Sequence, residues 1–252
     1  MSSVPQPVSA PAPEAKPLSQ IERIVDVFIA PRKTFTDLLR SAAWWAPWLL
    51  VVLVSVSFVY VGGEKVGFRK ISENNMKAQP KQQAALEQLP PAAREQRMDQ
   101  VANFTKALSY SFWIFQLVIL VIIAALQFGT FKLAAGANVT FKVALAIVIY
   151  ASLPGIIKAL LAIVSLVAGA SPDSFTFQNP LATNPAYFMD PSSSPFLYSL
   201  GSSLDIFLIW TLILNAFAYT CVSKVKMGTA LAVVLGWWIV ITLGFSSLAL
   251  LS

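Results

Sequence analysis

Five long apolar stretches limit, more than any other feature, what this chain can fold into. Each is at least 22 residues long and carries no more than one charged residue. A helix of about 20 apolar residues crosses a hydrocarbon core about 30 Å thick. Because backbone amides in lipid need hydrogen bonds within their own segment, we expect helices. The sequence therefore predicts an all-α polytopic membrane protein, a bundle of five transmembrane helices. The expected spans are residues 42–63, 107–131, 143–170, 196–223 and 227–251.

The composition agrees with a membrane protein and argues against an enzyme. Hydrophobic residues make up 56% of the chain and charged residues 12%, whereas a soluble domain carries about 25% charged residues. The chain has no histidine, which removes the commonest general base and metal ligand. Its single cysteine, Cys221, cannot form an intrachain disulfide or a multi-cysteine metal site. With no phosphate-binding glycine loop either, we expect no catalytic residues, no cofactor and no metal site.

The N-terminal region divides into a tail and an amphipathic segment. Residues 1–20 are rich in proline, alanine and serine, which predicts a disordered tail. Residues 21–39 carry apolar side chains at helical spacing and are interrupted by Pro31, which predicts two short helices that are too polar to span. They precede a tryptophan-rich entry into the first span, so we expect them to lie at the membrane interface. The alternative is that they pack on the protein's own helix ends. The expected contact residues are Phe28, Pro31, Arg32, Lys33 and Phe35.

The distribution of basic residues predicts the orientation. Residues 64–106 form a polar, helix-prone loop, and residues 171–195 contain five prolines but no lysine or arginine. Basic residues lie near the ends of the spans on the N-terminal side, which favours a cytoplasmic N-terminus and an external C-terminus. The eight basic residues of 64–106 argue the other way, but long segments cross with less regard to charge.

Two charged residues fall inside the expected spans. Lys158 lies in the third span and Asp205 about two turns into the fourth. Each charge alone is costly in lipid, so we expect the two to form a pair. The pair is either a structural lock between helices or part of a substrate or proton pathway. Pro154 and Gly155, one turn before Lys158, predict a kink in the third span.

Three stretches resemble the Yip family of membrane proteins, named for interaction with Ypt/Rab GTPases. They are VDVFIAPRKTFTDLL at 25–39, TFKVALAIVIYASLPGIIKALLAIV at 140–164 and LDIFLIWTLILNAFAYTCVSKVKMGTALAVVLGWW at 204–238. The resemblance covers residues 21–252, and the third stretch is similar to bacterial members. It implies a five-span helical bundle with a cytoplasmic N-terminus, in a bacterial inner membrane. A GTPase partner does not follow, because the cytosolic motif of the eukaryotic members is missing.

Two functions are therefore expected from the sequence. The first is a non-enzymatic scaffold that organises membrane or protein partners through residues 21–39. The second is a small transporter or permease component that uses Lys158 and Asp205. The expected partners are the lipid bilayer and either another membrane protein or a further copy of this chain. Nucleic acid is not expected, because basic and acidic residues are interleaved and no recognition motif occurs.

Overall fold

The computed structural model describes residues 17–77 and 79–248, and within these residues every regular element is a helix. Most of the expected tail, residues 1–16, lies outside the described residues, while Gln20 already belongs to the first helix. The helices are α1 (Gln20–Ile29), α2 (Pro31–Asp37), α3 (Trp45–Lys65), α4 (Phe68–Met76), α5 (Pro80–Glu87), α6 (Pro91–Leu133), α7 (Phe141–Ala151), α8 (Pro154–Val167), α9 (Pro195–Ser202), α10 (Ile206–Val222) and α11 (Met227–Leu248), with short 3-10 turns at Pro172–Ser174 and Pro185–Phe188.

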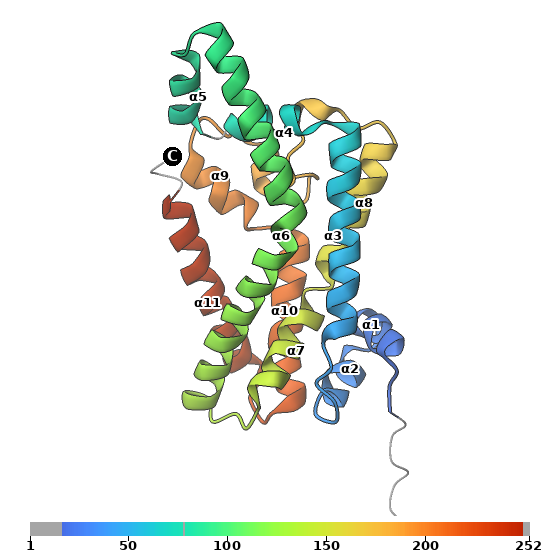
Figure 1. The fold of residues 1–252 in the computed structure, drawn as a ribbon. Helices are drawn as coiled ribbons and strands as arrows, with labels where there is room; N and C mark the ends of the chain where they lie inside the picture. Colours follow the sequence, from blue (N-terminus) through green and yellow to red (C-terminus); the bar gives the residue numbers. More distant parts are fainter. Residues whose placement is uncertain (1–16, 78, 249–252) are drawn as a thin grey trace, which may run out of the picture.

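The protein is an all-α polytopic membrane protein. Four segments of the described chain are long and apolar enough to cross a bilayer: α3, α6, the α7–α8 segment and α11. A fifth crossing is made if α9 and α10, which are bent by 53° relative to each other, count as one span. The chain passes up and down the bundle, so α1 and the end of α11 lie at opposite ends (Figure 1). We call the end that carries α1 and α2 proximal and the end that carries α4 and α5 distal.

The third span is broken where the sequence places a proline. Helix α7 ends at Ala151 and α8 begins at Pro154, whose ring nitrogen has no hydrogen to donate to the preceding turn. The two pieces differ in their surroundings. Every residue of 143–151 is buried, whereas most of α8 is not. The expected kink is therefore a break that separates a central helix from a peripheral one.

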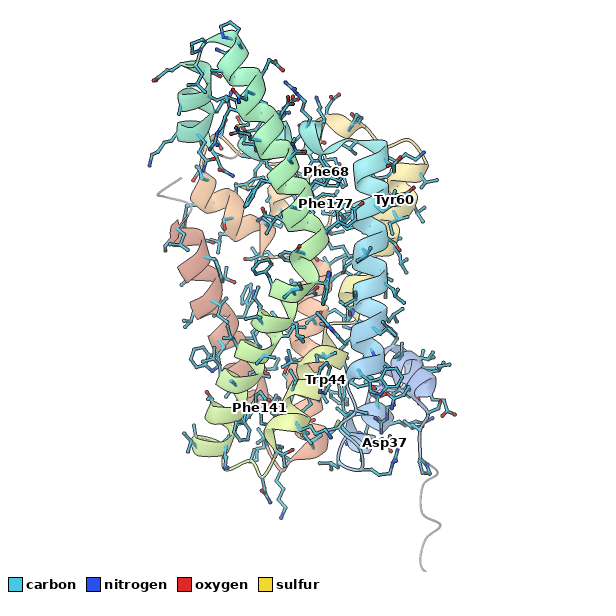
Figure 2. All side chains as sticks on the ribbon, in the orientation of Figure 1. Asp37, Trp44, Tyr60, Phe68, Phe141 and Phe177 are labelled. Atoms are coloured by element: carbon cyan, nitrogen blue, oxygen red, sulfur yellow. The ribbon has the colours of Figure 1, made fainter. Side chains whose placement is uncertain are left out.

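The distal end is closed by chain that returns from outside the spans. Helix α6 starts well before its apolar part, at Pro91, and continues through it without interruption. The segment 171–195 folds back onto the bundle, where Phe177 packs edge-on against Phe58 of α3 at 5.3 Å between ring centroids. A Cβ on Gly62 would lie 2.6 Å from the Phe177 ring, so this approach requires glycine. Figure 2 labels Phe177 beside Phe68, the first residue of α4.

Candidate functional site

The structure brings Lys158 and Asp205 into direct contact. The Lys158 Nζ lies 2.8 Å from the Asp205 Oδ2, and the two side chains are 20% and 5% exposed. The hydroxyl of Thr183 donates to the same Oδ2. The other carboxylate oxygen accepts from the backbone N–H groups of Phe207 at 3.0 Å and Leu208 at 3.4 Å. Both oxygens of a buried carboxylate are thus hydrogen-bonded.

Asp205 occupies a different structural position from the one expected. It is not two turns inside a continuous fourth span, because that span is broken between Ser202 and Ile206. Asp205 instead caps the N-terminus of α10, where the first backbone N–H groups have no partner within the helix. A carboxylate is favoured there by the helix dipole as well as by the hydrogen bonds. The sequence signal for this break was the Ser-Ser-Leu-Asp run, which is typical of a helix start.

Three segments of the chain meet at this carboxylate. Lys158 comes from α8, just after the break in the third span, and Asp205 stands at the break in the fourth. Thr183 comes from the segment 171–195, and its carbonyl also accepts from the Ile206 N–H at 3.1 Å. Removing either charge would leave the other unpaired in a poorly solvated place. The pair and Thr183 therefore join two spans and the distal segment.

The expected interfacial residues differ in their exposure. Arg32 and Lys33 are exposed, and the Arg32 guanidinium lies 5.5 Å from the Phe217 ring centre. Pro31, half-buried, is the first residue of α2. Phe28 is half-buried against Trp210, with 5.7 Å between ring centroids. Phe35 is fully buried in the main core, so it does not reach the interface as expected. Phe35 instead packs against the protein itself, because the side of α2 that carries it faces the core.

A buried arginine that the sequence reasoning missed joins α1 to α2. Arg23 is 0% exposed; its Nε donates to Asp37 Oδ2 at 2.7 Å and its Nη1 to the Ser41 carbonyl at 2.8 Å. The Thr34 hydroxyl donates to the Arg23 carbonyl at 2.8 Å. The spacing in the sequence could have indicated this burial. Arg23 lies four residues before Val27, so the two share one face of the helix.

Opposing effects act on the pKa of the Asp37 carboxyl. Burial alone would raise this pKa, but hydrogen bonds and charge from Arg40 and Arg23 lower it below its usual value. Arg40 donates to Asp37 Oδ1 at 2.8 Å from the solvent side. Asp37 therefore stays ionised between two guanidinium groups. It holds α1 and α2 together as one unit.

The outer face of α1 carries an apolar stripe. Ile21, Val25 and Ile29 are 75%, 47% and 74% exposed. They recur every four residues and so lie along one side of the helix. On the other side, Arg23 and Val27 are fully buried. The Tyr150 hydroxyl of α7 donates to the Gln20 side chain at 3.1 Å, so α1 is fixed to the bundle while its stripe faces outward.

The described residues contain no group of three or more potential metal ligands of the His, Cys, Asp and Glu types. The described side chains offer the Lys158–Asp205 pair, the Arg23–Asp37–Arg40 cluster and the exposed apolar stripe on α1. No curated protein and no solved structure matches the chain. The family model of the Yip1 domain matches residues 25–248, which include both broken spans and the second half of α1. The chain therefore belongs to the Yip family.

Proposed function

We propose that this protein is a non-enzymatic scaffold that organises protein or membrane partners, with the outer face of α1 as the contact surface. The exposed stripe of Ile21, Val25 and Ile29 carries the proposal. Exposing an apolar stripe to water is unfavourable, and such surfaces commonly bind a protein or a membrane. Because the inner face of α1 is fixed by Arg23, the stripe is presented in one orientation.

We further propose that the proximal end faces the cytoplasm of a bacterial cell, from within its inner membrane. The short links between α6 and α7 and between α10 and α11 lie at the same end as α1 (Figure 1). Lys132 and Lys142 flank the first link at the ends of α6 and α7, and Lys224 and Lys226 lie in the second, whereas the distal segment 171–195 has no basic residue. Basic residues beside short loops favour the cytoplasmic side. A reporter fused after Ser252 should be active only outside the cytoplasm.

Photocrosslinking in native membranes tests the contact surface. A photoreactive amino acid at Val25 should give discrete adducts, because Val25 is on the stripe. The matched control is Val27, two residues away on the same helix and fully buried. Protein adducts at position 25 that are absent at position 27 support a protein scaffold, and lipid adducts alone support anchoring to the membrane surface. Equal labelling at the two positions, or none at Val25, contradicts the proposal.

A transporter is the second candidate, and the meeting of two broken spans favours it. Interrupted helices in transporters place ion and substrate sites near the middle of the membrane. Here both interruptions adjoin the Lys158–Asp205 pair. Proton flux into liposomes, followed with an internal pH-sensitive dye, discriminates the candidates. Flux that Asp205→Asn abolishes supports transport, whereas inert vesicles containing folded protein support the scaffold.

A further inference from the structure

A cavity of about 710 Å³ lies in the distal half of the bundle, between α3, α6, the region of α4 and the folded-back segment 171–195. We propose that it holds one membrane lipid with an uncharged, hydroxyl-bearing headgroup. The size lies within the range of small-molecule sites in proteins. Its location is far from the stripe on α1, so the proposal does not depend on the scaffold function.

The mouth of the cavity opens on the side of the bundle that lipid covers. Val56 of α3 and Leu108 and Phe112 of α6 line the cavity and are 36%, 41% and 51% exposed. All three lie within apolar helix that is expected to cross the bilayer. The gap between these three side chains admits a molecule from the hydrocarbon. This route selects a lipid.

The walls combine aromatic rings with uncharged polar groups. Phe58, Trp113 and Phe177 supply apolar surface suited to an acyl chain. Figure 2 shows Phe177 between α3 and α6, where the folded-back segment enters the bundle. No aspartate, glutamate, lysine or arginine is among the described residues that line the cavity. The nearby Lys77 is not a lining residue, and it already donates to Asn74 Oδ1 at 3.1 Å and to the Asp173 carbonyl at 3.0 Å. A phosphate headgroup would therefore meet no cation among the lining side chains, so the site favours an uncharged headgroup.

Side-chain amides give the cavity much of its hydrogen-bonding capacity. Asn75, Gln116 and Gln178 line it, and none of the three side chains hydrogen-bonds to another residue in the part of the chain described. Gln116 is the most telling of these, because it lies nine residues inside the apolar run that starts at residue 107, roughly 14 Å deep. An amide at that depth needs a partner.

The arrangement of the polar groups fixes the orientation of the lipid. Asn75 and Gln79 come from α4 and the residues after it, at the distal surface, while Gln178 belongs to the folded-back segment. A headgroup at this rim would point toward the distal surface, with its tail running down between α3 and α6. The Gln116 amide would meet a hydroxyl or an ester carbonyl near the glycerol backbone. Hydroxyls suit amides because they both donate and accept.

Native mass spectrometry of the full chain tests the proposal, with equimolar dioleoylglycerol and phosphatidylglycerol in mixed micelles. We expect one dioleoylglycerol per protein and a preference for it over the anionic lipid. Gln116→Leu keeps the size of the side chain but removes its hydrogen bond, and should weaken binding by about fivefold. Ser109→Phe places a ring in the cavity and should abolish binding.

Gln100→Leu is the matched control. It makes the same change on the same helix, at an exposed residue that does not line the cavity, and should leave binding unchanged. The melting temperature of each variant identifies any that fails to fold. Equal or stronger binding of phosphatidylglycerol would overturn the proposal, as would the absence of any bound lipid. Wild-type binding by folded Gln116→Leu would overturn it as well.

Discussion

The proximal and distal halves of the bundle are built in different ways. In the proximal half, nine consecutive residues of α7 are buried and belong with α2, α3, α6, α10 and α11 to one continuous core. In the distal half the buried core reduces to Ile71, Leu166 and Phe175, with a few half-buried aromatic neighbours. The large cavity lies in this half.

Small residues explain why the proximal half is closely packed. Ala144 and Ala146 on α7 and Ala216 and Ala218 on α10 are fully buried. Between helices in lipid, side chains of this size allow the backbones to approach closely, and dispersion contacts then supply the attraction. The distal half relies on hydrogen bonds instead. There the Asn74 amide of α4 donates to the carbonyls of Pro172 and Phe175 at 2.8 and 2.9 Å. A rigid proximal half thus supports a more open distal half.

The largest effect should come from the ion pair that joins the halves. Lys158→Ala leaves Asp205 charged, buried and without its cation, and should lower the free energy of unfolding by about 4 kcal/mol. Chemical denaturation in detergent micelles measures this loss. Lys158→Ala with Asp205→Asn should recover part of it, because asparagine can still cap α10. If the loss in the double variant equals the sum of the single losses, the two residues are not coupled.

The next largest effect should appear when a leucine is truncated on each of the two pieces of the third span and the losses of stability are compared. Leu145 of α7 is 7% exposed and Leu161 of α8 is 48% exposed. Leu145→Ala should cost about 3 kcal/mol, because it opens a cavity in the tight core. Leu161→Ala should cost less than about 1 kcal/mol, because lipid chains can fill the space it leaves. Denaturation of the two variants under one condition gives the ratio. Equal losses would mean that α8 is covered by protein in the membrane.

A smaller effect should follow acidification at the proximal end. Since the pKa of Asp37 is lowered in the folded protein, its contribution to stability is complete above the ordinary aspartate pKa of about 3.9. It is lost as the pH falls through the lowered value. Below about pH 4, α1 and α2 should therefore loosen from each other while the core of the spans remains. Hydrogen exchange of residues 20–37 measures this change.

Asp37→Asn provides the control for that experiment. At neutral pH it should show the fast exchange in α1 that the unaltered protein shows only in acid, and further acidification should change it little. Fast exchange that spreads through α7 at the same pH would show that the unit of α1 and α2 does not open separately from the core.

Hydropathy and charge alone predict much of the fold, because each span must satisfy its own backbone in lipid. The expected third span shows this: Pro154 predicts the interruption that the structure has. The fourth span shows the limit. Asp205 looks like an isolated charge inside a helix when only hydropathy is considered, but it caps a helix that starts there. Its bond with Thr183 depends on how residues 171–195 fold back, and no periodic pattern encodes that path.

The N-terminal helices show a second limit. Their amphipathic spacing identifies an apolar side and a polar side, but it does not say which side faces the protein. The charged Arg23 is buried, whereas Ile21 and Ile29 are exposed, because Asp37 and the Ser41 carbonyl receive the guanidinium group. A partner 14 residues away, Asp37 at the end of the next helix, reverses what hydropathy predicts. The cavity is likewise invisible in the sequence, since its lining comes from separate elements.

The smallest effect should come from the distal ion cluster. Arg69 contacts Glu95, Asp99 and Glu73, but all four side chains are at least 41% exposed. Water already solvates such charges well, and salt screens them further, so Arg69→Ala should change unfolding least of all these variants. Denaturation at low and at high salt measures the difference, which should disappear at high salt. A loss as large as that of Lys158→Ala, and insensitive to salt, would mean that α4 is held to α6 chiefly by these charges. The contrast between the two halves would then reflect a difference in the kind of contact and not a difference in rigidity.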